Sequence, residues 1–482
     1  MFNIKNAKNL AFFYYYLYHF KFLILKENGL FVRMIICCLR RGKIMSLKKL
    51  IEKKDEYAQY MIDEITTIIK TFGKRNPGSE GEKKAVEYMG TLVDKACDGN
   101  VKVEPFKLHP MGFFHWIWIT GACVVAALIL SFIYPLVGVI LTVFGFTVLT
   151  TQFVLYLRTF DKLFKPATSH NLIALRKPTG EVKRRIFFNG HPDAAFEWTM
   201  NNWFGGVGFV GHAIMSGVGG VYVGIVSLAA AIVNKGTYVP FSEWVLGLQI
   251  ATYVGLIFIP CYIILFFMFN TNYCVDGAND NLTACMLAVA VVKALEDEGI
   301  ELENTEVGVL LSGSEEGGLR GAKAFCEMHP DEYHDVETII LAFDTMHELD
   351  YLYVNEKDMN TLVKADDYTS GLFFKACDNL GIRCFSGAIP LGATDSAAFN
   401  LGGYKAAGIT ALDHNLQDYY HTRRDSYDNL DKECLAACFA ACIESLRIFD
   451  AQEPVMTLAE RKARTKENLA SLKAERKAKK KK

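Results

Sequence analysis

The chain has 482 residues, enough for one large α/β domain with additional segments or for two to three ordinary domains. Its 52 basic and 53 acidic side chains nearly cancel, which argues against a nucleic-acid-binding protein. The thirteen cysteines form no CxxC pair or other metal-type spacing, so we expect buried, reduced thiols, as in a domain on the cytoplasmic side of a membrane.

Residues 1–44 differ in character from the rest of the chain. An aromatic and apolar run from Leu10 to Leu25 is interrupted by His19 and Lys21, and no small-residue cleavage site comes after it. The segment is either an uncleaved anchor or sequence upstream of a true start at Met45. We favour the second interpretation, in which the start of the chain is mis-assigned and 1–44 is non-native sequence; an N-terminal leader is the alternative.

Ordinary α/β elements begin after Met45. Apolar residues recur at helical spacing from Leu47 to Phe72, and Ser79 with Glu82 three residues later is a capping-box pattern that begins a second helix. Strand character is found at 101–106, 170–175 and 186–190.

Two largely uncharged inserts, 111–158 and 203–272, interrupt these elements. No Asp, Glu, Lys or Arg occurs between Lys107 and Arg158, and a membrane-spanning helix needs only about 20 apolar residues. Each insert therefore predicts a pair of transmembrane helices, about four in all. Buried core helices are the alternative. The aromatic flanks favour bilayer interfaces instead: Trp116, Trp118, Trp203 and Trp244.

Paired spans leave and return to the same side of the membrane, so strands before, between and after the inserts can join one sheet. The domain-side flanks carry Lys107, Arg158, Lys162 and Lys165, whereas the opposite turns carry only Lys235. The excess of positive charge predicts an integral, multi-pass membrane protein with its soluble domain in the cytoplasm.

The basic tail, 451–482, is expected to be a solvated helix or disordered, with attraction to anionic lipid headgroups as the alternative.

Strands and helices alternate after the second insert, which predicts a sheet covered on both faces. Helices are expected at 282–296, 321–328, 372–380 and 435–449, and strands at 307–311, 338–343 and 408–412.

Acids and histidines follow several of these apolar strands. Glu315 and Glu316 are adjacent, and two ionised neighbours usually need a cation to offset their repulsion, although a solvated loop would also suit them. Further candidates occur at other strand ends and in a glycine-led loop: His191, Asp193, Asp280, Asp344 and His421. Such residues are expected to meet at one edge of the sheet. Histidine, aspartate and glutamate without cysteine are typical of a hydrolytic zinc or manganese centre.

The short motifs around these residues also occur in a particular order. They are Gly78-Ser79-Glu80-Gly81, Ser169-His170-Asn171, His191-x-Asp193, Gly277-Ala278-Asn279-Asp280-Asn281, Ser314-Glu315-Glu316-Gly317, Phe343-Asp344, Thr394-Asp395-Ser396 and Tyr420-His421-Thr422. In these motifs the chain resembles the zinc aminopeptidase family that includes bacterial leucyl aminopeptidases, glutamate carboxypeptidase and glutaminyl cyclases. The resemblance covers 47–106, 168–200 and 274–450. It implies a three-layer α/β/α fold with a central mixed sheet, here a metallopeptidase domain at 45–450 that the membrane hairpins interrupt.

The resemblance also implies a role for each residue. His191 and Asp344 would hold one metal ion, Glu316 and His421 a second, and Asp280 would bridge both. Glu315 would be the general base, and Tyr420 would donate a hydrogen bond to the oxyanion. Asp193 lies two residues beyond His191, so both face the same side of an extended strand, and its carboxylate can fix the imidazole.

The resulting expectation is a membrane-bound di-zinc exopeptidase, an aminopeptidase, with Mn²⁺ or Co²⁺ as alternative metals. Its partners would be a peptide substrate and the lipid bilayer, with no nucleic acid; the sequence leaves the oligomeric state open. A single-zinc acyl transferase similar to glutaminyl cyclase is the first alternative. A non-catalytic receptor or scaffold on the same fold is the second.

Overall fold

The computed structural model describes residues 47–413 and 415–479. The chain divides into two units, Met1–Glu52 and Lys53–Lys482. In the first unit, 47–52 are helical, and the prediction for 1–44 lies outside the described residues. The second unit contains the sheet, the apolar helices and the candidate site.

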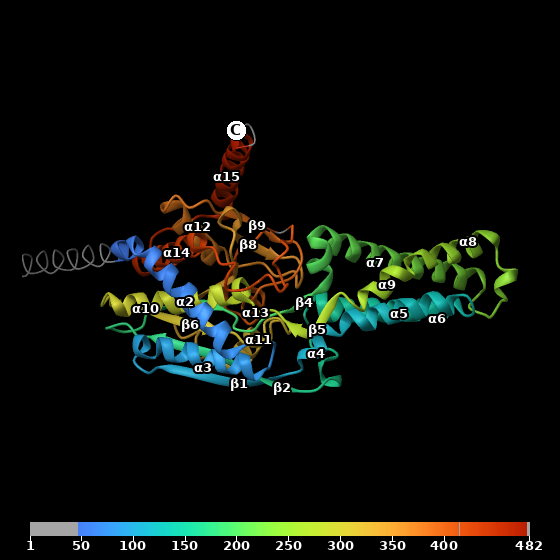
Figure 1. Ribbon diagram of the computed structural model, residues 1–482, viewed down its shortest axis with the longest axis horizontal. Helices are drawn as coiled ribbons and strands as arrows, with labels where there is room; N and C mark the ends of the chain where they lie inside the picture. The colour runs from blue at the N-terminus through green and yellow to red at the C-terminus, as the bar shows by residue number, and fades with distance from the viewer. Residues whose placement is uncertain (1–46, 414, 480–482) are drawn as a thin grey trace, which may run out of the picture. The chain divides into compact units, whose positions relative to one another are not determined.

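An eight-stranded mixed sheet is the centre of the second unit (Figure 1). Its order is β1 (Val101–Leu108), β2 (Ala167–Arg176), β6 (Thr305–Leu311), β3 (Arg184–Gly190), β7 (Glu337–Met346), β10 (Lys405–Ala411), β8 (Leu352–Asp358) and β9 (Phe385–Ile389). The central strands β6, β3, β7 and β10 are parallel to their neighbours in this group. β1 pairs antiparallel with β2, β2 with β6, and β8 with β10. The mixed sheet that the resemblance implied is confirmed.

Helices cover both faces of this sheet, because side chains of its buried strands alternate between the two faces. On one face, the ring of Phe187 in β3 lies 6.1 Å from the ring of Phe325 in α11 (Arg320–Met328), and α13 (Asp395–Leu401) packs beside α11. On the other, Gly190 of β3 directly meets α10 (Thr283–Asp297). Further helices pack around these: α2 (Lys54–Phe72), α3 (Glu80–Asp94), α12 (Asp367–Asn379) and α14 (Lys432–Ala451). The α/β/α layers are therefore as predicted.

The two inserts form apolar helices that lie together beside the sheet (Figure 1). They comprise α4 (Pro110–Phe114), α5 (Trp116–Ser131), α6 (Pro135–Val148), α7 (Thr199–Val233), α8 (Leu246–Gly255) and α9 (Ile259–Leu265). A small sheet of β4 (Phe196–Trp198) and β5 (Phe269–Cys274) joins the second insert to the domain. Helix α7 thus begins four residues before the predicted insert, with a bend at Gly205, where φ is +67°.

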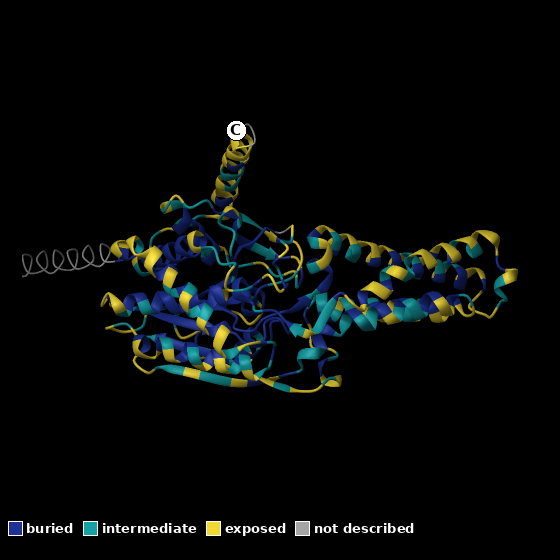
Figure 2. Cartoon of the chain, in the orientation of Figure 1, coloured by how far each residue is buried: buried dark blue, intermediate teal, exposed yellow. Residues whose placement is uncertain are grey.

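Five helices among the described residues are long and apolar enough to cross a membrane. Four belong to the inserts, and their apolar windows are only 39%, 28%, 39% and 22% buried. Their outward sides are largely exposed (Figure 2). The fifth, Ala278–Asp297, is 94% buried and is a core helix of the α/β domain. Of these five helices, the four of the inserts therefore have apolar faces that the other described residues leave largely uncovered.

Most of the described part of the basic tail is helical, as α15 (Leu458–Lys479). It is not wholly solvated, because the guanidinium of Arg461 is buried and paired with Glu356 at 2.8 Å and Asp367 at 2.7 Å. These ion pairs attach the start of α15 to the α/β domain.

Candidate metal centre

The predicted site residues meet at one edge of the sheet, where the parallel strands β3, β6 and β7 end. Their positions are His191 after β3, Asp280 in the turn before α10, Glu315 and Glu316 after β6, Asp344 near the end of β7, and His421 after β10. All are buried or half-buried. Parallel strands bring their carboxyl ends to a common edge, which explains how segments far apart in the sequence converge there.

The ligand atoms form two groups that share Asp280. His191, Asp280 and Asp344 make the first group and Asp280, Glu316 and His421 the second; within each group the atoms lie within 4.8 Å of one another. His421 Nε2 lies 2.8 Å from Oδ2 of Asp280, and His191 Nε2 lies 3.3 Å from Oδ1. Each carboxylate oxygen of Asp280 therefore faces a different histidine, an arrangement suited to a bridging ligand between two metal ions.

The donors of this cluster fit a divalent cation. Burial raises the pKa of Asp344 to about 7, and the neighbouring Asp280 adds to the shift. Burial lowers the pKa of His421, but Glu316 and Asp280 outweigh it and raise that pKa to about 10. Oδ1 of Asp280 and Oε1 of Glu316 are buried and have no hydrogen-bond partner among the described residues. Closely packed acids with unsatisfied oxygens, next to two imidazoles, match the ligand preferences of zinc.

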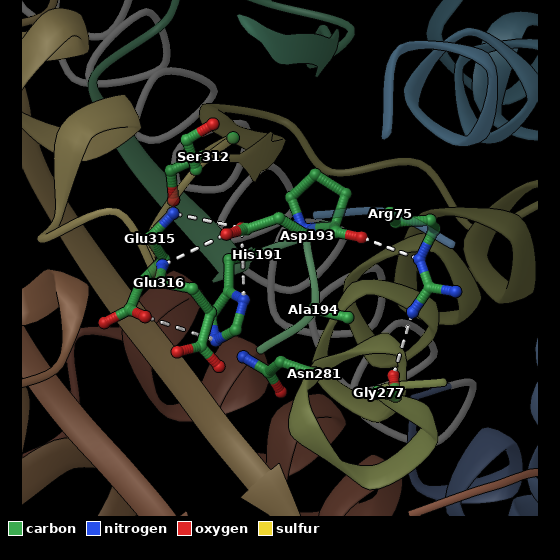
Figure 3. A network of polar contacts seen from close by, with 12 residues as sticks. Arg75, His191, Asp193, Ala194, Gly277, Asn281, Ser312, Glu315 and Glu316 are labelled. Atoms are coloured by element: carbon green, nitrogen blue, oxygen red, sulfur yellow. Dashed lines mark hydrogen bonds and ion pairs between the residues drawn. The ribbon is translucent and has the colours of Figure 1, made fainter. Parts of the chain in front are cut away.

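Asp193 holds two parts of the centre at once (Figure 3). Its Oδ1 lies 3.4 Å from Nδ1 of His191, the contact expected from their spacing. The same carboxylate accepts hydrogen bonds from the backbone N–H groups of Glu315 and Glu316, each at 3.0 Å. The sequence predicted the contact with His191 but not the hydrogen bonds from the backbone, because every residue except proline has a backbone N–H group. Asp193 is fully buried, so these bonds are shielded from water.

Glu315 belongs to neither ligand group, although it lies beside them. Its Oε2 is 3.8 Å from Nε2 of His191. Burial raises the pKa of Glu315 well above its ordinary value; His191 opposes this shift and the nearby Asp395 reinforces it. A buried carboxylate that lies beside the ligand groups and belongs to neither can accept and return a proton.

Two further buried acids support the loops of the centre, and sequence reasoning missed both roles. Glu82 accepts from the backbone N–H of Ser314 at 2.6 Å and from its hydroxyl at 2.9 Å. The predicted cap is present, since Ser79 accepts from the N–H of Glu82. The Glu82 carboxylate also accepts from the N–H of Gly78 through Oε2, while Oε1 is directed to Ser314, next to Glu315. Asp425 accepts from the N–H of Asp280 at 3.1 Å. In the sequence, only its position four residues after His421 pointed to a role for Asp425 near the centre.

A cavity of about 570 Å³ opens onto Glu315 and both ligand groups. Tyr420, predicted to face the oxyanion, lines this cavity, and its ring stacks on that of His421 with centroids 4.1 Å apart. Pockets of this size enclose most of the surface of a small ligand. The remaining walls are largely aromatic and aliphatic and include residues of both inserts.

Comparison with known proteins gives one match by sequence: residues 267–446 fit the model described as Peptidase family M28. No curated protein matches the chain. Similar solved structures include an aminopeptidase from Aneurinibacillus sp. strain AM-1, with 12% identity, a TM-score of 0.48, and coverage of 83% of this chain and 95% of that one. A zinc aminopeptidase from Bacillus subtilis has 14% identity, a TM-score of 0.46 and coverage of 81% and 94%. An Acidobacteriales bacterium glutaminyl cyclase has 12% identity, a TM-score of 0.45 and coverage of 82% and 95%. The family match agrees with the resemblance over residues 267–446, which contain the motifs from Gly277 to Thr422; the earlier motifs lie outside the matched residues.

Proposed function

We propose that this chain, a zinc metallopeptidase-like hydrolase of the peptidase family M28 type over residues 267–446, is a membrane-embedded di-zinc exopeptidase that removes N-terminal residues from peptides. The observation that carries the proposal is the pair of ligand groups joined at Asp280, with Glu315 beside them and outside both. A one-metal enzyme would need only one such group.

Glu315 is the proposed general base. It takes a proton from the water molecule whose oxygen attacks the scissile carbonyl, and it returns that proton to the nitrogen of the departing amine as the C–N bond breaks. Zinc, when bound, supplies a Lewis acid that makes water acidic enough to react at neutral pH. Asp193 keeps Glu315 in place through the backbone N–H at 3.0 Å, and Tyr420 faces the developing oxyanion from the cavity wall.

The apolar insert helices support a place in the lipid bilayer. They are long enough to span it, and their outward faces are uncovered within the described residues. The positive charge on the domain side, at Lys107, Arg158, Lys162 and Lys165, supports a cytoplasmic catalytic domain.

Metal content and a single substitution test the proposal together. The detergent-purified protein is expected to bind two zinc ions, with Mn²⁺ or Co²⁺ as replacements, and to release amino acids from peptides until a chelator is added. Glu315→Gln is expected to keep both ions and lose about 10²–10⁴-fold in kcat, the usual contribution of a general base. Full activity in this variant would rule out the mechanism.

The same measurements separate the alternatives. One tightly bound zinc at full activity, with cyclisation of N-terminal glutamine, would favour an acyl transferase similar to glutaminyl cyclase. Zinc binding without turnover of any peptide would favour a receptor or scaffold.

A further inference from the structure

The inserted helices contribute walls to the cavity that opens onto the candidate centre. Phe114 at the end of α4 and Trp116 at the start of α5 line one side. Phe209, Val210 and Ile214 of α7 line another. These residues are apolar and come from the parts of the inserts nearest the α/β domain, so the proposed membrane helices and the proposed catalytic residues enclose the same space.

Hydrogen bonds fix the start of the second insert to the loop that carries His421. The backbone N–H of Trp198 donates to the carbonyl of His421 at 2.7 Å, and the side-chain amide of Asn201 donates to the carbonyl of Tyr420 at 2.8 Å. Gly206 lies so close to this loop that a Cβ would come within 2.2 Å of the Leu416 carbonyl oxygen. The α7 wall is therefore held rigidly against the second ligand group.

The first insert is fixed in a similar way to the loop after Glu316. Arg320 forms a buried ion pair with Asp161 at 2.9 Å and donates to the carbonyl of Gly318 at 3.1 Å. Lys323 donates to the carbonyl of Tyr156, in the segment that leaves the insert, and to that of Gly318. Both inserts are thus attached to the metal-ligand loops as well as to the sheet.

The cavity is open on the α7 side. Val210 and Ile214 line it and yet are 37% and 59% exposed, so their side chains lie at a rim. At about 1.5 Å per helical residue, Ile214 lies about 13 Å beyond the bend at Gly205, on the part of α7 that the proposed membrane would surround. The neighbouring outward residues of α7 are also apolar and exposed, including Val207, Val218 and Val221.

We infer that the substrate is an apolar peptide dissolved in the bilayer, which enters over the α7 rim and brings its N-terminal end to Glu315; this inference rests on the proposed function. A polar peptide that arrives from water would lose hydration of its polar groups at the apolar rim, which costs free energy. An apolar peptide gains free energy there, because its side chains bury apolar surface against the rim. The aromatic walls at Phe114 and Trp116 suit bulky apolar side chains next to the cleaved bond.

The test compares two peptides with the full-length, zinc-loaded protein in lipid vesicles. One is a water-soluble leucyl dipeptide and the other an apolar decapeptide with the same N-terminal leucine; release of leucine gives kcat/KM for each. We expect the decapeptide to be preferred about tenfold or more. Ile214→Trp should narrow the rim and reduce kcat/KM for the decapeptide about five times more than for the dipeptide.

Ile225→Trp is the matched control, since Ile225 is 62% exposed on the same helix and does not line the cavity. It should leave both rates unchanged. Two results would overturn the substrate inference and leave the proposed peptidase function intact. One is a preference for the dipeptide. The other is an equal effect of Ile214→Trp on both peptides, as a lipid-filled cavity would give. Failure to release leucine from either peptide overturns the proposed function, and the inference with it.

Discussion

Replacing Asp193 with asparagine tests the role of a carboxylate that contacts His191 and also accepts hydrogen bonds from the glutamate pair. Its oxygens accept from the backbone N–H groups of Glu315 and Glu316, each at 3.0 Å. Asparagine keeps the shape but turns one acceptor into an NH₂ donor, which must then face a backbone N–H. The change removes a hydrogen bond to a charged acceptor, about 1.5–3 kcal/mol, and leaves a buried N–H unsatisfied, about 1–3 kcal/mol. The free energy of unfolding should therefore fall by about 2.5–6 kcal/mol.

The assay for this variant is zinc affinity, measured by competition with a chromophoric chelator, alongside thermal unfolding. Because His191 also loses its carboxylate partner, zinc should bind about 10–100-fold more weakly. Asp366→Ala is the control: Asp366 caps α12, accepts from the N–H of Thr369 at 2.8 Å, and belongs to neither ligand group, and loss of such a cap costs about 0.5–2 kcal/mol. It should lower stability and leave zinc affinity unchanged. Wild-type zinc affinity in Asp193→Asn would refute the reasoning.

Two further substitutions probe the loop contact of α7 and a buried acid. Gly206→Ala should weaken zinc binding and peptidase activity, because the new Cβ would lie 2.2 Å from the carbonyl oxygen of Leu416. The control is Gly211→Ala, whose Cβ has no neighbour within 4 Å and which should leave both properties unchanged. Equal effects of the two substitutions would contradict the role of this contact. Burial raises the pKa of Asp358 from 3.8 to about 7. The stabilisation from its bound proton is complete below about pH 4 and is lost as pH rises through about 7. Asp358→Asn can still accept from the N–H of Thr394, so its melting temperature should exceed that of the wild type by more at about pH 8 than at about pH 5. A constant difference would show that Asp358 does not titrate in this range.

The sequence predicted which residues lie together at the candidate centre better than it predicted the hydrogen bonds that hold them there. His191, Asp280 and His421 could be assigned because each lies in a short motif, and because parallel strands must end at a common edge. Glu82 and Asp425 could not be assigned, since both act on backbone N–H groups and any residue can supply those. An acid at a helix start predicts a cap, and only the folded chain reveals which of several nearby N–H groups its carboxylate meets.

The positions of the apolar helices were also predictable to within a few residues, because the near absence of charge over tens of residues is a strong signal. Their attachment was not. It depends on Gly206, whose lack of a side chain permits a close approach, and on Asp161 with Arg320, which are commonplace charged residues on the surface of most proteins. In the sequence, Gly206, Asp161 and Arg320 look like ordinary loop or surface residues. Gly206 and Leu416, and likewise Asp161 and Arg320, are also more than a hundred positions apart.

These attachments bear on whether the inserts are separable from the α/β domain. An anchor joined through a flexible linker could be deleted with little effect on the rest. Here, removal of the first insert with its return segment would leave Arg320 buried without Asp161, and breaking a buried ion pair in this way costs about 3–5 kcal/mol. Removal of the second insert together with the whole of α7 would also take away Asn201, which donates a hydrogen bond to the carbonyl of Tyr420 next to His421. The whole of Lys53–Lys482 forms one compact unit, so the apolar helices belong to the folded framework that positions the candidate centre.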